Sequence, residues 1–222
     1  MFDKNLGFDP GPIATVQQLL EIRVHECGDR MVLLDPNVFK IMSAELPWLR
    51  RRFADMLISA NDQMRRLDHP TWRLLIHYAH RNDEKQRREY EAALQSIRAA
   101  NALWTDEQVL AEATRQWAHP DVAGHPTGGS VDISIWDDVN EAEVPMPTKY
   151  DDFTIPAASY RRYPHATAEQ RANAGYLERR LAKWGIYPYP GEWWHFDFGN
   201  REWAWGTGNP VAIYGAVSSP TE

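Results

Sequence analysis

Two segments of the sequence carry side chains whose types and spacing could hold a catalytic metal ion. In the first, His125 opens the stretch His-Pro-Thr-Gly-Gly-Ser-Val-Asp, which ends at Asp132. Imidazole and carboxylate are suitable zinc ligands, and the glycines between them let the loop fold back so that both reach one ion. On its own this segment is weak evidence, because a lone histidine is more often an ordinary polar residue than a ligand.

The second segment places Glu192 three residues before His195, in the stretch Gly-Glu-Trp-Trp-His. In an ideal strand the two side chains would point to opposite faces. The preceding pair, Pro190-Gly191, predicts a turn, so Glu192 is not yet in the strand and can approach the same site as His195. The alternative is an ordinary strand with Glu192 exposed and His195 half-buried, and this segment alone leaves both interpretations open.

Together the two segments predict a zinc hydrolase centre. His125, Asp132 and His195 are three ligands of the kind that leave a fourth zinc position open for water. Glu192 supplies the general acid/base, which takes a proton from the attacking water and later delivers it to the leaving amine. Both segments border predicted strands, so a rigid sheet could carry the site.

Hydrophobic periodicity predicts the elements that must position these residues. Helices are expected over residues 16–24, 44–67, 83–100, 105–117 and 167–184. Strands are expected over residues 30–34, 72–78, 131–136, 193–198 and 202–205, with loops over 119–130 and 187–191 and a mostly irregular stretch over 140–166. Because the elements follow no regular βαβ rhythm, we expect an α+β fold with a mainly antiparallel central sheet flanked by helices.

Length, net charge and cysteine content indicate which classes of protein the sequence fits. The chain has 222 residues, a length that suits one globular domain over residues 1–222. Its net charge is −7, and the sequence shows no basic stripe that would bind a nucleic-acid backbone. The basic run Arg50-Arg51-Arg52 is expected to be a solvated helix face. We expect no signal peptide and no membrane span. Cys27 is the only cysteine, which fits a reducing cytoplasm. The oligomeric state cannot be predicted.

The motif pair is specific enough to show a family resemblance. The pattern His-x-x-Gly-x-x-x-Asp, followed about sixty residues later by Glu-x-Trp-His, resembles the D-alanyl-D-alanine dipeptidase family. These VanX-like zinc enzymes are related in fold to the DD-carboxypeptidases and the Hedgehog signalling domain. Residues 144–153 resemble the family's Val-Pro-Met segment with its aromatic-Asp pair, and residues 73–76 leading to Arg81 resemble a strand that ends in a functional arginine. The resemblance covers about residues 15–206.

The resemblance implies roles for individual residues. His125, Asp132 and His195 would bind one Zn²⁺ per chain, and Glu192 would be the catalytic acid/base. Arg81 would stabilise the oxyanion of the tetrahedral intermediate, and Asp151 would hold the substrate's free ammonium group. The implied protein is a cytoplasmic zinc metallopeptidase with a DD-peptidase/Hedgehog-like fold, which hydrolyses D-Ala-D-Ala or a closely related small dipeptide.

The sequence departs from the family at two places beside this site. The family arginine sits in Asp-x-Tyr-Arg-Pro, whereas here the stretch from Tyr78 to Asn82 reads Tyr-Ala-His-Arg-Asn. The family serine two residues before the first metal histidine is Ala123, which cannot donate a hydrogen bond. One alternative is therefore the same zinc site acting on another small amide in a specialised biosynthetic pathway. Another is a non-catalytic zinc-bearing binding module, which the presence of Glu192 disfavours.

Three neighbouring residues have open interpretations. His80 could be a replacement pocket residue, although a surface or sheet-edge histidine is the expectation. Asp197, on the same strand face as His195, could orient that ligand or be an ordinary strand-end aspartate. Trp194 is expected in the core.

Overall fold

Strand β6 (Ser130–Asp137) divides the molecule into an apolar side and a polar side. Val131, Ile133 and Ile135 are fully buried on one face of the strand. Because successive side chains of a strand point to opposite faces, Asp132 and Ser134 project from the other. The sheet therefore buries its core against one face and presents polar groups on the second.

The computed structural model describes residues 12–152, 166–218 and 220, and the central sheet lies within them. Its strands follow the order β3-β5-β6-β9-β8, and β7 also pairs with β6. The bounds are Lys40–Ile41 for β3, Trp72–Tyr78 for β5, Ala142–Glu143 for β7, Tyr187–Pro188 for β8 and His195–Asp197 for β9. β3 pairs with β5 in parallel, and the other neighbouring strands pair antiparallel. The predicted α+β class with a mainly antiparallel sheet is confirmed.

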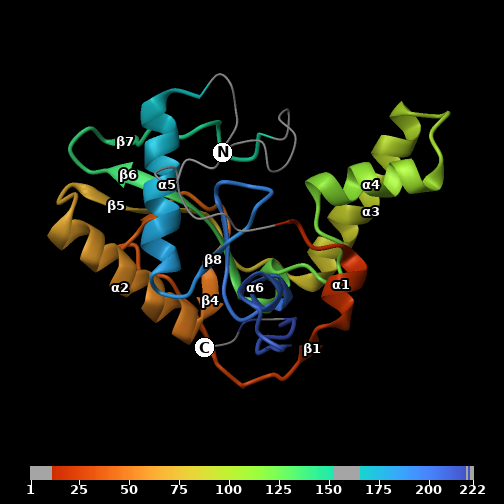
Figure 1. Cartoon of the computed structure of the whole chain (residues 1–222), viewed down its shortest axis with the longest axis horizontal. Coiled ribbons are helices and arrows are strands. Elements are labelled where there is room, and N and C mark those ends of the chain that lie inside the picture. The colour runs from red at the N-terminus through yellow and green to blue at the C-terminus, as the bar shows by residue number, and fades with distance from the viewer. Residues whose placement is uncertain (1–11, 153–165, 219, 221–222) are drawn as a thin grey trace.

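Two helices cover the apolar face of the sheet. They are α2 (Arg51–Leu67) and α5 (Ala168–Ala182); in Figure 1, α5 crosses in front of the strands and α2 runs beside them. Side chains at helical spacing, such as Phe53 and Leu57 on α2 and Leu177 on α5, are fully buried in one cluster with the strand residues. Thr167 begins α5 with a capping box, as the sequence predicts.

The helices α3 (Asp83–Ala100) and α4 (Asp106–Gln116) form a hairpin that projects from the rest of the chain in Figure 1. Asn82 caps α3 by accepting hydrogen bonds from two backbone amides, and Thr105 opens α4 with a capping box. The predictions for both helices are confirmed, because cap residues and periodicity agree at their ends.

Short elements complete the described fold. The helices are α1 (Val16–Glu21), α6 (Arg201–Thr207) and the 3₁₀ turn η1 (His125–Thr127). The strands β1 (Arg23–Val24) and β10 (Val211–Ala212) pair in parallel, while β2 (Met31–Leu33) and β4 (Trp48–Arg50) pair antiparallel. None of the described helices has the length and apolar character needed to cross a bilayer.

The long helix predicted over residues 44–67 is wrong in its first third. Trp48–Arg50 form strand β4, and the helix begins at Arg51. Pro47 disfavours helical geometry at the residue before it, and Trp48 to Arg50 find partners in β2. The helix predicted over residues 16–24 ends at Glu21 for a similar reason, since Arg23 and Val24 pair with β10.

The strand predicted over residues 202–205 is wrong. This segment lies in α6, where Asn200 caps the helix by accepting from the Trp203 amide and Gly208 ends it at φ +71°. The segment of four residues is too short to separate the period of a strand from that of a helix. The turn predicted over 187–191 begins with the short strand β8, and the strand predicted over 193–198 is shorter, at His195–Asp197.

The expected solvated face over residues 50–52 is wrong for Arg50. Its side chain is buried, forms an ion pair with Glu26 at 2.9 Å and donates to the carbonyl oxygens of Thr127, Asp29 and Gly215. Arg51 instead pairs with Asp55 on the helix surface.

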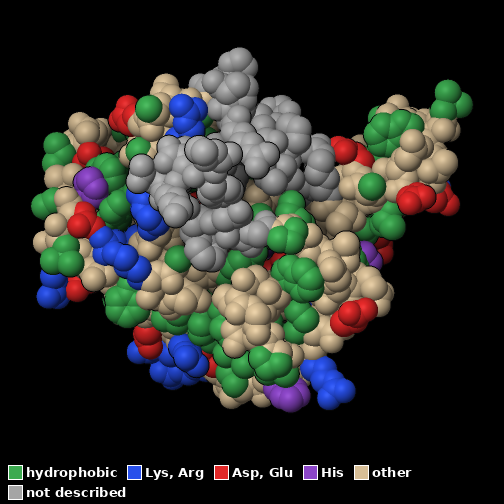
Figure 2. Space-filling view, in the orientation of Figure 1, with side chains coloured by type: hydrophobic (Ala, Val, Ile, Leu, Met, Phe, Trp, Pro, Cys, Tyr) green, Lys and Arg blue, Asp and Glu red, His purple; other side chains and the backbone are tan. Residues whose placement is uncertain are grey.

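On the face of the molecule in Figure 2, basic and acidic side chains lie beside one another. Phe153 of the family-like segment lies outside the described residues.

Candidate metal centre

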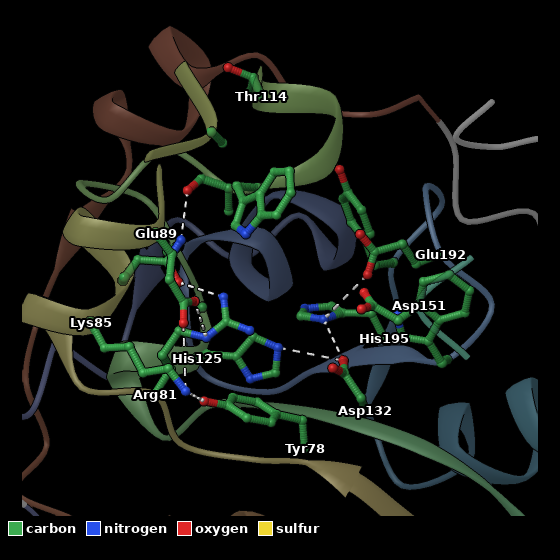
Figure 3. Close-up of a pocket in the computed structure, with 18 of the residues that line it drawn as sticks. Tyr78, Arg81, Lys85, Glu89, Thr114, His125, Asp132, Asp151, Glu192 and His195 are labelled. Carbon is green, nitrogen blue, oxygen red and sulfur yellow. Dashed lines mark hydrogen bonds and ion pairs between the residues drawn. The ribbon is translucent and has the colours of Figure 1, made fainter. Parts of the chain in front are cut away.

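Three side chains from separate elements converge on the polar face of the sheet. Asp132 on β6 lies directly opposite His195 on β9 in the strand register, and His125 comes from η1. The Asp132 Oδ1 atom is 3.0 Å from His195 Nδ1 and 3.4 Å from His125 Nε2. One ligand atom from each residue lies within 4.8 Å of the others. Figure 3 shows the three side chains pointing toward one another. The structure thus brings together the three residues predicted as metal ligands.

The second ring nitrogen of each histidine is bound away from this cluster. His125 Nδ1 lies 2.6 Å from the Ala79 carbonyl oxygen. A carbonyl oxygen can only accept, so Nδ1 carries the proton and Nε2 is left as a ligand atom. His195 Nε2 lies 3.2 Å from Asp197 Oδ1, which leaves Nδ1 facing Asp132. Metal-ligating histidines almost always have such an outer partner.

Asp197 is itself held from two sides. Its Oδ1 atom accepts hydrogen bonds from Ser130 Oγ at 2.5 Å and from Asn200 Nδ2 at 2.6 Å. The geometry therefore favours the interpretation of Asp197 as an orienting carboxylate over that of an ordinary strand-end residue. A Cβ atom at Gly124 would lie 1.9 Å from Ser130 Oγ, so glycine is required for the His125 loop to approach this network.

The electrostatics of the cluster fit a cation. Burial alone would raise the pKa of Asp132, but His125 and His195 together lower it by a larger amount. The net pKa therefore lies well below the usual range, and the carboxylate is ionised. Burial lowers the pKa of His125, which favours the neutral imidazole that metals bind. Burial also opposes charge on His195, but Asp197 and Asp132 raise its pKa well above the usual value. A metal cation would take the place of the proton between His195 and Asp132.

Glu192 lies before β9, outside the strand, as the sequence predicts. Its Oε2 atom is 3.9 Å from His195 Nδ1. Burial raises the pKa of Glu192 to about 7, with His195 opposing the shift and Asp132 adding to it. A carboxyl group whose pKa is near neutrality can both accept and donate a proton.

Arg81 and Asp151 line the cavity that also contains this cluster. The cavity has a volume of about 660 Å³. Arg81 donates to Gln86 Oε1 at 3.0 Å, and its guanidinium lies over the Tyr78 ring. Burial opposes the charge of Arg81, but Tyr78 and nearby carboxylates raise its pKa, so it remains a cation. Asp151 has a φ of +61°, and burial raises its pKa. Both residues therefore line the cavity that also contains His125, Asp132 and His195.

The departures from the family motif also lie at this cavity. Ala123 lines it and is nearly inaccessible to solvent. His80 is not a surface residue, because only 6% of it is exposed and its Nε2 lies 2.9 Å from the Val217 carbonyl oxygen. It is also absent from the described lining of the cavity. Trp194 is buried as expected, and it also lines the cavity.

Sequence reasoning gave no role to Tyr150 and Glu202, which are two of the polar residues that line the cavity. The Tyr150 hydroxyl donates a hydrogen bond to Asp132 Oδ2 at 3.0 Å. Glu202 lines the cavity, and burial, reinforced by Asp197, raises its pKa to about 8. Treating residues 202–205 as a strand concealed Glu202, whereas recognising Asn200 as a helix cap would have placed it in the first turn of α6. No sequence signal indicates the contact of Tyr150.

The chain matches a known protein family and a curated relative. Residues 70–207 match the model of the Peptidase_M15 family, described as D-ala-D-ala dipeptidase. A D-alanyl-D-alanine dipeptidase from Synechocystis sp. is 28% identical over 159 residues, which is 61% of this chain and 63% of the relative's length. The aligned part therefore spans less than two thirds of that relative.

Solved structures of low identity also resemble the chain. VanYB in complex with D-Alanine-D-Alanine matches with a TM-score of 0.46 and 16% identity, over 76% of this chain and 82% of the other. The D,D-pentapeptidase VanY in complex with Zn(II) matches with a TM-score of 0.45 and 14% identity, over 83% and 89%. The LdcB LD-carboxypeptidase matches with a TM-score of 0.47 and 12% identity, over 95% and 94%.

Proposed function

Because the chain belongs to the D-Ala-D-Ala dipeptidase family of the M15 peptidases, we propose that it is a zinc-dependent dipeptidase. Its proposed substrate is D-Ala-D-Ala or a closely related small dipeptide, in line with the name of its aligned relative. The observation that carries the proposal is the convergence of His125, Asp132 and His195 beside Glu192 in one cavity.

The three proposed ligands fit zinc by the chemistry of their donor atoms. Two imidazole nitrogens and one carboxylate oxygen leave a fourth tetrahedral position open, which is the pattern of catalytic zinc sites. When bound, zinc supplies Lewis-acid chemistry that polarises a carbonyl group and makes water nucleophilic at neutral pH. The outer hydrogen bonds of His125 and His195 hold both rings in the orientation that this binding needs.

Glu192 acts as the proton carrier in this proposal. Its carboxylate accepts the proton of the attacking water and delivers it to the leaving amine. The position of Glu192 next to His195, and its raised pKa in the buried cavity, support this role.

Arg81 and Asp151 orient the substrate. The guanidinium of Arg81 faces the cavity and stabilises the negative charge that develops on the scissile carbonyl oxygen, an effect worth about 3 kcal/mol for a fixed donor. The carboxylate of Asp151 binds the free ammonium group and thereby restricts the enzyme to short peptides. Both residues line the cavity together with Glu192.

A second candidate is the same zinc site acting on a different small amide. Ala123 favours it, because this side chain lines the cavity and offers no hydrogen bond where the family has a serine. A pocket that lacks one polar contact binds the family's usual substrate less tightly by about 1 kcal/mol.

The test is metal analysis and peptide hydrolysis on one purified sample, with D-Ala-D-Ala, D-Ala-D-Ser, L-Ala-L-Ala and D-Ala-D-lactate. We expect one zinc per chain and cleavage of the D,D-dipeptides, with kcat/KM of about 10⁴ M⁻¹s⁻¹ or more. His195→Ala is the control and should bind no zinc at this site. Zinc binding without cleavage of any panel member would favour the second candidate, and absence of zinc binding would refute both.

A further inference from the structure

The two oxygens of the Asp132 carboxylate lie in different surroundings. Oδ1 lies 3.4 Å from His125 Nε2 and 3.0 Å from His195 Nδ1, so it belongs to the ligand cluster. Oδ2 accepts the hydrogen bond from the Tyr150 hydroxyl at 3.0 Å. We propose that the Tyr150 hydroxyl is a positioning group that makes Asp132 bind the metal through Oδ1 alone. This inference rests on the proposed function, because it assumes a metal at the three ligands.

The ring of Tyr150 is held in place by its neighbours. It stacks on the imidazole of His77 with ring centroids 4.3 Å apart and planes at 9°, and it meets Trp194 edge-on at 5.7 Å. His77 is fixed in turn, since its Nε2 lies 2.8 Å from Ser134 Oγ and 3.1 Å from Glu143 Oε1. The sheet therefore presents the hydroxyl to Asp132 from a fixed position, not from a freely rotating side chain.

A carboxylate can bind a metal through one oxygen or through both. With one oxygen from Asp132, two imidazole nitrogens and one open position, the site has the four-coordinate geometry that zinc prefers. Without the hydrogen bond, Oδ2 can also turn toward the metal. A site with more oxygen ligands suits six-coordinate ions such as Mn²⁺ better. The Tyr150 hydroxyl thus favours zinc both by orienting the ligand and by limiting its coordination.

Tyr150 also lines the cavity, so a direct contact with substrate is the competing role. The two roles predict different measurements. A substrate contact changes KM and leaves the metal affinity of the free enzyme unchanged. A positioning role changes the metal affinity when no substrate is present.

The experiment compares Tyr150→Phe with the wild-type protein. Phenylalanine keeps the ring and its stacking on His77 and loses the hydroxyl alone. The affinity of the metal-free proteins for zinc is measured by competition with a coloured chelator. We expect Tyr150→Phe to bind zinc about 10- to 100-fold more weakly, the usual effect of removing an outer partner of a ligand. The visible spectrum of the cobalt(II)-substituted variant should lose intensity, because cobalt with an added oxygen ligand absorbs less than four-coordinate cobalt.

Tyr78→Phe is the matched control. Tyr78 also lines the cavity, and its ring lies edge-on to His125 at 5.4 Å. Its hydroxyl, however, bonds to Glu45 and Lys85 at 3.1 Å each. Removing it should leave the zinc affinity and the cobalt spectrum as in the wild type.

Equal zinc affinity and equal cobalt spectra in Tyr150→Phe and wild type would overturn the inference, and so would a change in KM alone. Thermal melting of the metal-free proteins shows whether the variant folds. If it does not, His77→Gln decides, because it removes the stacked ring and keeps the hydroxyl. Weaker zinc binding in that variant supports the inference, and unchanged binding contradicts it.

The outcomes also separate this inference from the proposed function. A wild-type protein that binds zinc and cleaves no dipeptide refutes the dipeptidase activity, while the affinity comparison still decides the role of Tyr150. An active wild type with an unaffected Tyr150→Phe variant refutes only the role of Tyr150. A wild type that binds no zinc refutes both.

Discussion

The two walls of the cavity are built by different kinds of interaction. The sheet wall consists of His125, Asp132 and His195, and the helix wall consists of Arg81 and the α3 residues Lys85 and Glu89 (Figure 3). In the sheet wall, strand register places Asp132 opposite His195, and hydrogen bonds to Ala79 and Asp197 fix the rings.

The helix wall depends on ion pairs between long side chains. Arg81 Nε lies 3.7 Å from Glu89 Oε2, and Lys85 Nζ lies 3.6 Å from Glu89 Oε1. Lys85 also pairs with Glu45. Such pairs are partly exposed and are weakened by salt. The difference indicates that geometry for the metal is built into the backbone, whereas the opposite wall can adjust to what it binds.

The largest effect is expected next to the sheet wall, from Glu192→Gln; Glu192 lies 3.9 Å from His195. The amide cannot accept the proton of the attacking water, so kcat should fall by about 10²- to 10⁴-fold. Zinc content should be unchanged, because Glu192 is not among the proposed ligands. Glu202→Gln is the control, since Glu202 is another carboxyl group of the same cavity. Activity near the wild-type level in Glu192→Gln would refute its role as acid/base.

On the helix wall, Arg81→Ala should lower kcat by about 10²- to 10³-fold, because the developing negative charge loses its fixed donor. Zinc affinity should stay the same, and this distinguishes the two walls. Arg87→Ala is the control, since Arg87 lies on α3 but pairs with Asp83 and Asp121 at the surface. A loss of zinc from Arg81→Ala would show that the walls are not independent.

A smaller effect is expected from Asp197→Asn, which weakens the outer bond of His195. Zinc affinity should fall by about 10- to 100-fold, as for other outer partners of metal ligands. The measurement is a chelator competition with Asp137→Asn as control, an aspartate at the far end of β6. If both variants bind zinc as the wild type does, Asp197 does not support the sheet wall.

The smallest effect is expected from Glu45→Gln, which removes the carboxylate that pairs with Lys85. Burial raises the pKa of Glu45, but the hydrogen bond and the charge of Lys85 lower it by more, so the net pKa lies below its usual value. A carboxyl group whose pKa is lowered on folding stabilises the protein at pH values above its unfolded-state pKa. This stabilisation is lost as the pH falls through the folded-state pKa. The pair is partly exposed and screened by solvent, so the expected loss at pH 7 is below about 1 kcal/mol.

Urea unfolding at pH 7 and at lower pH tests this prediction. The difference between Glu45→Gln and the wild type should disappear once Glu45 is protonated in both folded and unfolded states. A difference that grows as the pH falls would contradict the sign of the pKa shift.

The helices and strands that the sequence predicted correctly are those with clear local signals, namely helix caps and hydrophobic periodicity. Residues 83–100 and 105–117 have caps and periodicity that agree, and the apolar run of residues 72–78 forms β5 as expected. Some of the errors arose where tertiary pairing prevailed over local pattern. Residues 48–50 joined β2 instead of extending a helix, and Arg50 was buried because Glu26 and three carbonyl groups surround it.

The sequence alone determined which residues the proposed chemistry would use, because His125, Asp132, Glu192 and His195 are recognisable by type and spacing. Only the tertiary structure decided how these groups are held. The contact of Tyr150 with Asp132 depends on a loop, a stacked ring on β5 and the pairing of β6 with β9. No local pattern encodes such contacts, since they form between segments far apart in the chain once the sheet has set their positions.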